Sequence, residues 1–108
     1  MKVQLREIAY ARSGDKGTNA NVGVAVRRRE DYELLKRLLT EEVVGGYFGD
    51  LPLTGIKRYE LANLGALNFV LENGLDGGAT DPLRLDPQGK TLGESLMLME
   101  VEVPDDRA

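Results

Sequence analysis

A polar run of ten residues between two apolar segments is the feature that most constrains the fold of this chain. Residues 12–21 carry two glycines, charges of both signs, hydroxyls and amides, whereas residues 3–10 and 22–26 have the composition of strands. This order predicts two strands joined by a polar bend. A plain hairpin turn requires only a Gly or Asn at a special backbone angle, so the additional polar groups predict a functional role for the bend.

The bend is predicted to bind an anionic small molecule through a carboxylate or phosphate group. Gly14 and Gly17 can adopt positive φ, which would bring consecutive backbone N–H groups together in a concave anion site. Lys16 and Arg12 would supply positive charge, and neighbouring amide side chains would bind a polar or acyl part of the ligand. The candidate ligand-binding residues are Arg12, Ser13, Gly14, Asp15, Lys16, Gly17, Asn19 and Asn21, together with Asn63 and Asn68.

The same residues also allow a purely structural interpretation. Asp15 would accept backbone N–H bonds, Lys16 would pair with a carboxylate, and Asn21 would satisfy buried backbone groups. Asp15 would also repel an anionic ligand unless it is itself paired. For Asn63 and Asn68 two alternatives stay open: their amides are paired inside the fold, or they reach the bend and complete one pocket with it.

The chain contains no cysteine and no histidine. It therefore forms no disulfide, no zinc site of Cys and His, and no Ser-His-Asp triad of its own. Any proton transfer would use a carboxylate, Lys, Tyr or bound water. We predict neither a metal site nor a cofactor. Asp76-Gly77-Gly78 lacks the remaining ligands of a calcium loop, and Gly89-Lys90-Thr91 lacks the first glycine of a P-loop, because Arg84 stands there.

The formal net charge of −4 argues against nucleic-acid binding, which depends on clustered cations. Arg27–Arg29 form a basic cluster, but Glu30, Asp31 and Glu33 follow at once, so we expect a solvated, self-neutralised strand end. No apolar run approaches the ~20 residues that a transmembrane helix requires, and the charged N-terminal segment does not resemble a signal peptide. We expect a cytoplasmic protein that binds neither nucleic acid nor a membrane.

The first half of the chain is predicted to contain two strands and two helices. A shift of the apolar face within residues 3–10 indicates a bulge near Arg6 and Glu7. Residues 22–26 are apolar on both faces, which is typical of a central strand that is covered on both sides or paired at an interface. Asp31 is expected to cap a helix that runs to Leu39, and Thr40 to begin a second short helix.

The second half is predicted to continue with alternating strands and helices. Residues 55–62 read as a strand, and leucines at spacings of three and four predict a helix over residues 64–75. A short edge strand at residues 83–85 and a helix over residues 91–96, begun by a capping box, follow. The alternation at residues 99–103 predicts a half-exposed strand.

These elements predict one domain over residues 1–108, with a frayed tail at residues 104–108. The irregular alternation of strands and helices favours an α+β sandwich with helices on one face of a mainly antiparallel sheet. A small sheet with one open face gains stability when that face is buried against a second copy, so we expect a homo-oligomer.

Three strings of this sequence resemble one known family. They are SGDKG at residues 13–17 with NVGV at 21–24, NLGALNFV at 63–70, and DPQGKTLG at 86–93. Together, over about residues 3–101, they resemble the ferredoxin-fold domain of acyclic terpene utilisation (AtuA-like) proteins. The resemblance implies a ferredoxin-like α+β fold and a metabolic setting alongside acyl-CoA carboxylases and related catabolic enzymes. It implies no catalytic residue, because the family has no assigned molecular activity.

Two departures from the family pattern matter. The domain usually follows a much larger N-terminal domain, so the resemblance implies a separate large AtuA-type chain as a partner. The family bend often ends in a second carboxylate, where Thr18 stands here. If that carboxylate is a metal ligand or a base in the family, this chain lacks it.

Two functions follow as alternatives. The first is a stand-alone accessory or binding domain in acyl-CoA or terpenoid catabolism. The second is a small enzyme that acts on an acyl-CoA or carboxylate substrate, with Asp15 as base and Lys16 as electrostatic stabiliser.

Overall fold

Four antiparallel strands form the larger of two sheets, in the order β2-β3-β5-β4. The computed structural model describes residues 1–16, 19–49, 53–72 and 92–104, without the side chains of Asp15 and Lys16. The strands are β2 (Ala9–Lys16), β3 (Asn19–Val26), β4 (Gly55–Leu61) and β5 (Ala66–Glu72). The predicted strands at 22–26 and 55–62 are confirmed, and β3 occupies a central position between β2 and β5.

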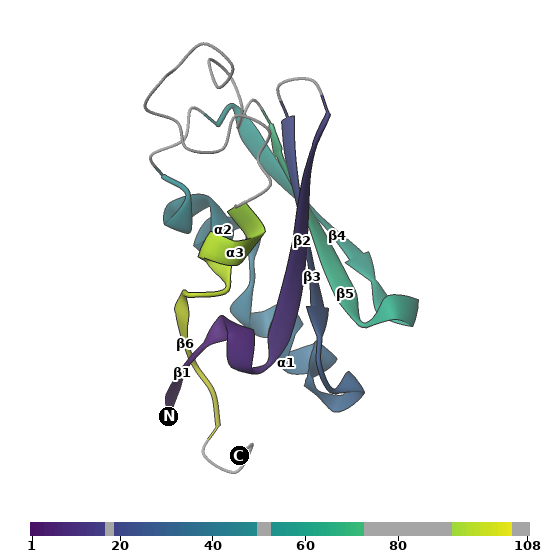
Figure 1. The fold of residues 1–108 in the computed structure, drawn as a ribbon, viewed down its shortest axis with the longest axis vertical. Coiled ribbons are helices and arrows are strands. Elements are labelled where there is room, and N and C mark those ends of the chain that lie inside the picture. Colours follow the sequence, from purple (N-terminus) through teal and green to yellow (C-terminus); the bar gives the residue numbers. More distant parts are fainter. Residues whose placement is uncertain (17–18, 50–52, 73–91, 105–108) are drawn as a thin grey trace.

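A separate two-stranded sheet joins β1 (Lys2–Gln4) to β6 (Glu100–Glu102), close to the two ends of the chain (Figure 1). The sequence predicted one bulged strand over residues 3–10, and this is wrong. A 3-10 helix, η1 (Leu5–Glu7), separates β1 from β2 and sends them into different sheets. Leu5 and Ile8 are both buried, so the chain turns between them to place both in the core.

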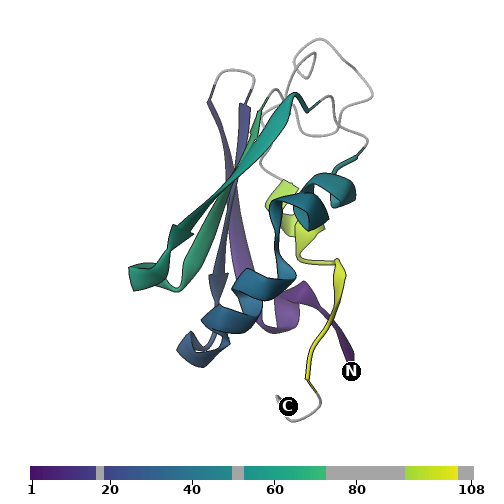
Figure 2. The same ribbon diagram turned by 180° about the vertical axis from the view of Figure 1, so that it is seen from behind.

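The helices cover one face of the four-stranded sheet, and the other face is left open by the described elements (Figures 1 and 2). They are α1 (Tyr32–Leu38), preceded by the 3-10 turn η2 (Arg29–Asp31), then α2 (Glu41–Tyr47) and α3 (Leu92–Leu96). Thr40 caps α2 as predicted, because its hydroxyl accepts a hydrogen bond from the Val43 amide at 3.1 Å. Asp31 stands at the N-cap position of α1 but makes no side-chain capping bond; its carboxylate lies 3.4 Å from Arg28 Nε.

The predicted helix over residues 64–75 is wrong, because β5 is a strand. Leu67, Phe69 and Leu71 are fully buried, whereas the intervening Asn68 and Val70 are half-buried on the opposite face. This alternation has the period of two that a strand requires. The sequence therefore contains both periodicities, and pairing with β3 and β4 selects the strand.

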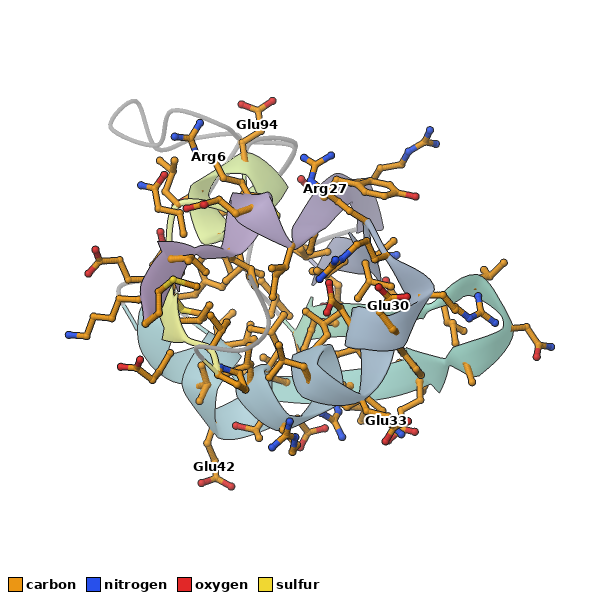
Figure 3. All side chains as sticks on the ribbon, turned by 90° about the horizontal axis from the view of Figure 1, so that it is seen from below. Arg6, Arg27, Glu30, Glu33, Glu42 and Glu94 are labelled. Atoms are coloured by element: carbon orange, nitrogen blue, oxygen red, sulfur yellow. The ribbon has the colours of Figure 1, made fainter. Side chains whose placement is uncertain are left out.

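The hydrophobic core lies between the larger sheet and the helices. Val22 and Val24 from β3 and Phe69 from β5 meet Leu35 and Leu96 from the helices there. Seen from below, the labelled side chains of Glu33, Glu42 and Glu94 point outward from the helices (Figure 3). The fold is thus the α+β arrangement that the sequence predicted.

Several predictions fall outside the described residues: the edge strand at 83–85, the capping Thr91 and the end of the tail at 105–108. The helix that ends at Leu96 and the closing strand are confirmed as α3 and β6. In the part of the chain that the structure describes, no helix is long and apolar enough to cross a membrane.

Candidate functional site

The polar run at residues 12–21 is a strand pair rather than a loop, except for residues 17 and 18, which lie outside the described part. Gly14 pairs with Asn21, Asp15 with Ala20, and Lys16 with Asn19 in the β2–β3 ladder. Among the described glycines, positive φ is found at Gly65 and not at Gly14. The predicted concave site of backbone amides around Gly14 is therefore not formed, because strand pairing holds that backbone extended.

Instead, the described side chains of Arg12 and Asn21 lie on the open face of the sheet. Successive residues of a strand point to opposite faces, so Arg12 shares a face with Tyr10 and Gly14. The register places Arg12 opposite Gly23 of β3, and Gly23 opposite Asn68 of β5. A row of residues from three adjacent strands thus crosses the sheet on the face that the helices leave open.

Part of this row borders a hollow of about 290 Å³. Its lining residues are Arg12, Ser13, Gly14, Asn21, Gly23 and Asn68. Five of the ten residues that the sequence singled out therefore lie around one depression, including Asn68 from a distant segment. This arrangement supports the alternative in which Asn68 joins the polar run, although it does so from a strand and not from a helix.

Arg12 supplies an exposed positive charge to the hollow. Its guanidinium makes no hydrogen bond or ion pair with any residue that the structure describes. By contrast, Arg58 donates to the carbonyls of Lys36 and Leu39 at 2.8 and 2.9 Å. Arg12 can therefore bind an anion without first breaking an ion pair with any of the described residues.

Gly23 leaves room for the hollow at the centre of the sheet. A Cβ atom at Gly23 would lie 3.8 Å from Asn68 Oδ1 and 3.9 Å from the Arg12 carbonyl oxygen. A glycine inside a strand weakens it and often marks a place where a ligand approaches the backbone closely. Because glycine has no side chain, nothing at this position covers Asn68 Oδ1 and the Arg12 carbonyl oxygen.

Ser13 lines the hollow but its hydroxyl binds outside it, and Asn19 and Asn63 are not among the lining residues. Ser13 turns its hydroxyl toward α3, where Oγ accepts a hydrogen bond from the Gly93 amide at 2.9 Å. Asn19 begins β3 and is half-buried. Asn63 lies in the 3-10 turn η3 (Ala62–Leu64), where its carbonyl accepts a hydrogen bond from Arg29 Nη1 at 3.0 Å. Asn63 borders a different hollow, so the structure does not bring it to Arg12.

The two ionisable residues of the enzyme alternative are placed only through their backbones. Asp15 and Lys16 belong to β2 and pair with Ala20 and Asn19. Their side chains lie outside the described part of the structure, so the catalytic roles assigned to them stay predictions. Gly17 lies outside it entirely.

Sequence reasoning missed an apolar hollow of about 320 Å³ that adjoins the polar one. Ala25 and Ala66 lie on its floor, and Tyr10 and Leu64 at its sides. The signal was present in β3, where Gly23 and Ala25 alternate with valines and leave one face of the strand without large side chains.

The basic cluster Arg27–Arg29, which follows β3, makes contacts with neighbouring residues close to this apolar hollow. Arg27 lies over the Tyr10 ring, with its guanidinium carbon 5.9 Å from the ring centroid, and its Nε donates to the Arg6 carbonyl at 2.9 Å. Arg28 Nε lies 3.6 Å from a Glu30 carboxylate oxygen. The prediction of a self-neutralised strand end thus describes Arg28, whereas Arg27 has a structural contact instead.

Titration and metal chemistry add little at this face. The hydrogen bond from Lys36 to Glu33 raises the pKa of the lysine, but both residues belong to α1, on the covered side of the sheet. In the described ranges, no group of three or more metal-ligating side chains comes together. The face offers a cation and two amides, which suit recognition of an oxyanion.

Comparison with known proteins identifies one family. A family model described as the AtuA ferredoxin-like domain matches residues 3–102. No curated protein and no solved structure matches the chain.

Proposed function

This chain belongs to the AtuA ferredoxin-like domain family, and we propose that it is an accessory domain that binds an anionic small molecule in acyl-CoA or terpenoid catabolism. The metabolic setting follows from the family resemblance of the three sequence strings. The binding role is supported by one observation above all. The guanidinium of Arg12, which has no partner among the described residues, borders the same hollow on the open face of the sheet as the side-chain amides of Asn21 and Asn68.

The chemistry of these three groups favours a carboxylate or phosphate. A guanidinium presents its N–H donors in a fixed fork that matches a planar oxyanion, and each amide adds two further donors. The register of β2, β3 and β5 holds the three residues on adjacent strands, so the site is largely formed before the ligand arrives. A hollow of about 290 Å³ suits the anionic part of a small metabolite.

Association with a protein partner is part of the same proposal. The partner is a second copy of this chain or a separate large AtuA-type chain. Tyr59 and Leu61 of β4 are 48% and 41% exposed on the open face, where apolar side chains of this size favour a protein contact. An accessory domain that binds but does not react would present its ligand to such a partner.

The experiment uses the intact chain, labelled with ¹⁵N, and titrates it with butyrate and with inorganic phosphate. The side-chain NH₂ signals of Asn21 and Asn68 report on the hollow directly. We expect them to shift with saturation, and we expect Arg12→Gln to weaken binding at least tenfold, because a charged hydrogen bond contributes roughly 1.5–3 kcal/mol.

Arg37→Gln is the matched control, because Arg37 is another exposed arginine with no ion pair in the described structure, and it lies on α1. It should bind like the unaltered chain. Equal binding by the Arg12 and Arg37 variants would contradict the proposed function. So would side-chain NH₂ signals of Asn21 and Asn68 that shift with neither butyrate nor phosphate.

A further inference from the structure

The apolar hollow and the polar hollow are contiguous on the open face, since Arg12 and Gly23 line both. The apolar part has a floor of small residues, Ala25 and Ala66, which face each other in the register of β3 and β5. Leu64, 69% exposed, borders it from the 3-10 turn η3 that follows β4. The face therefore changes from polar to apolar within two residues along each strand.

The sides of the apolar hollow are held in place from outside it. The Arg27 guanidinium lies against the Tyr10 ring, as described above. On the other side, Arg29 binds the Asn63 carbonyl and so fixes the turn that carries Leu64. The exposed side chains of Tyr10 and Leu64 are thus held on either side of Ala25 and Ala66. Because they are already ordered, less conformational entropy is lost when a hydrocarbon chain binds between them.

We infer that the two hollows form one binding site for an aliphatic carboxylate. Its carboxylate group lies against Arg12, Asn21 and Asn68, and its hydrocarbon chain runs over Ala25 and Ala66. This inference rests on the proposed function and adds the chemical class of the ligand.

Charge complementarity favours this occupant over a second copy of the chain. At the polar end of the combined hollow, the cation Arg12 has no ion pair with any described residue, and the other lining residues there are amides, glycines and Ser13. A second copy that covers the hollow by two-fold symmetry would bring the same cation to the same place. A carboxylate with an apolar tail satisfies the positive end and covers the exposed apolar end together.

The test is a chain-length series of acetate, butyrate, hexanoate and octanoate, titrated against the intact chain and followed by backbone amide shifts of Ala25 and Ala66. Each added methylene that enters the hollow should strengthen binding by up to roughly fourfold, the factor that corresponds to ~0.8 kcal/mol for each buried CH₂. The head-group signals of Asn21 and Asn68 should shift with every acid in the series.

A comparison of Leu64→Ser with Leu98→Ser distinguishes octanoate binding in the hollow from non-specific binding to exposed leucines. Both leucines are exposed, at 69% and 55%, so neither change should impair folding, and Leu98 does not line the hollow. We expect Leu64→Ser to weaken octanoate severalfold and to leave acetate unchanged, whereas Leu98→Ser alters neither. Ala25→Val places a larger side chain in the apolar hollow, so it should also weaken octanoate binding and leave acetate binding unchanged.

The outcomes distinguish the two proposals. Binding that depends on Arg12 but not on chain length overturns this inference and leaves the proposed function standing. Binding that strengthens with chain length but ignores Arg12→Gln supports the apolar hollow and contradicts anion recognition. Octanoate affinity that is reduced equally by Leu64→Ser and Leu98→Ser overturns the inference.

Discussion

The hydroxyl oxygen of Ser13 accepts a hydrogen bond from the backbone amide of Gly93 at 2.9 Å, across eighty residues of sequence. This bond ties the edge strand β2 to the first turn of α3. The amide belongs to the helix start, where N–H groups have no partner within the helix. Ser13 is thus a structural residue of the interface between sheet and helices, although its neighbours Arg12 and Gly14 belong to the candidate site.

Ser13→Ala should destabilise the protein by about 1–3 kcal/mol, because the half-buried contact would leave the Gly93 amide without its acceptor. Urea denaturation measures the change. Butyrate binding should stay as it is, since the lost hydroxyl faces α3 and not the hollow. A variant that keeps full stability but loses butyrate would instead place the Ser13 hydroxyl in the binding site.

Gly93→Ala should destabilise by about 1–3 kcal/mol, because it overpacks the same interface. The new Cβ would lie 3.0 Å from Ser13 Oγ and 3.1 Å from Ala11 Cβ. Gly46→Ala in α2 is the control: a Cβ there meets nothing within 4 Å, and alanine stabilises a helix by up to ~1 kcal/mol over glycine. Thermal unfolding of both variants tests the contrast, and changes of equal sign would refute it.

Gly23→Ala and Gly65→Ala should have opposite effects on stability. At Gly23 the strand backbone accepts alanine in ordinary contact, so stability should rise by roughly 0.5–1 kcal/mol, while the partly filled hollow binds butyrate less well. Gly65 has φ of 60°, and its Cβ would lie 3.1 Å from Val26 Cγ2, so stability should fall by at least ~1 kcal/mol. Chemical denaturation combined with butyrate titration checks both.

Phe69→Ala should lower the free energy of unfolding by about 3–5 kcal/mol, whereas Val70→Ala should lower it much less. Phe69 is fully buried in the core, and its neighbour Val70 is half-buried on the open face of β5. Urea midpoints with unchanged slopes measure the difference. Similar losses at the two positions would show that the open face of β5 is covered in solution.

Self-association, if the partner is a second copy, should depend on the β4 side of the open face. We expect the unaltered chain to sediment as an oligomer at high concentration and Leu61→Glu to sediment as a monomer with unchanged unfolding, since Leu61 is 41% exposed. Leu98→Glu, near β6 and 55% exposed, should sediment like the unaltered chain. A monomer at every concentration would contradict the second copy as partner.

Local sequence signals predicted the elements whose conformation depends on neighbouring residues alone. The Thr40 cap, the leucine spacing of α1 and the alternation in β6 each act within one or two turns or a few strand residues, and each was predicted. The apolar character of residues 22–26 likewise indicated the central position of β3. Composition excluded cysteine and histidine chemistry without any knowledge of the fold.

The incorrect predictions concern segments whose conformation is set by contacts with residues far away in the sequence. Leucines in residues 64–75 satisfy a helical spacing, but pairing of β5 with β3 and β4 outweighs that local preference. Residues 5–7 turn because Leu5 and Ile8 must both reach one core, which a single strand does not allow.

The sequence by itself determined that polar residues gather in residues 12–21 and that apolar segments flank them, because hydrophobic patterning acts locally. Tertiary structure alone decided which of those polar residues meet. Arg12, Asn21 and Asn68 share a hollow because the β2-β3-β5 register aligns them, and such a register arises from non-local hydrogen bonds and core packing.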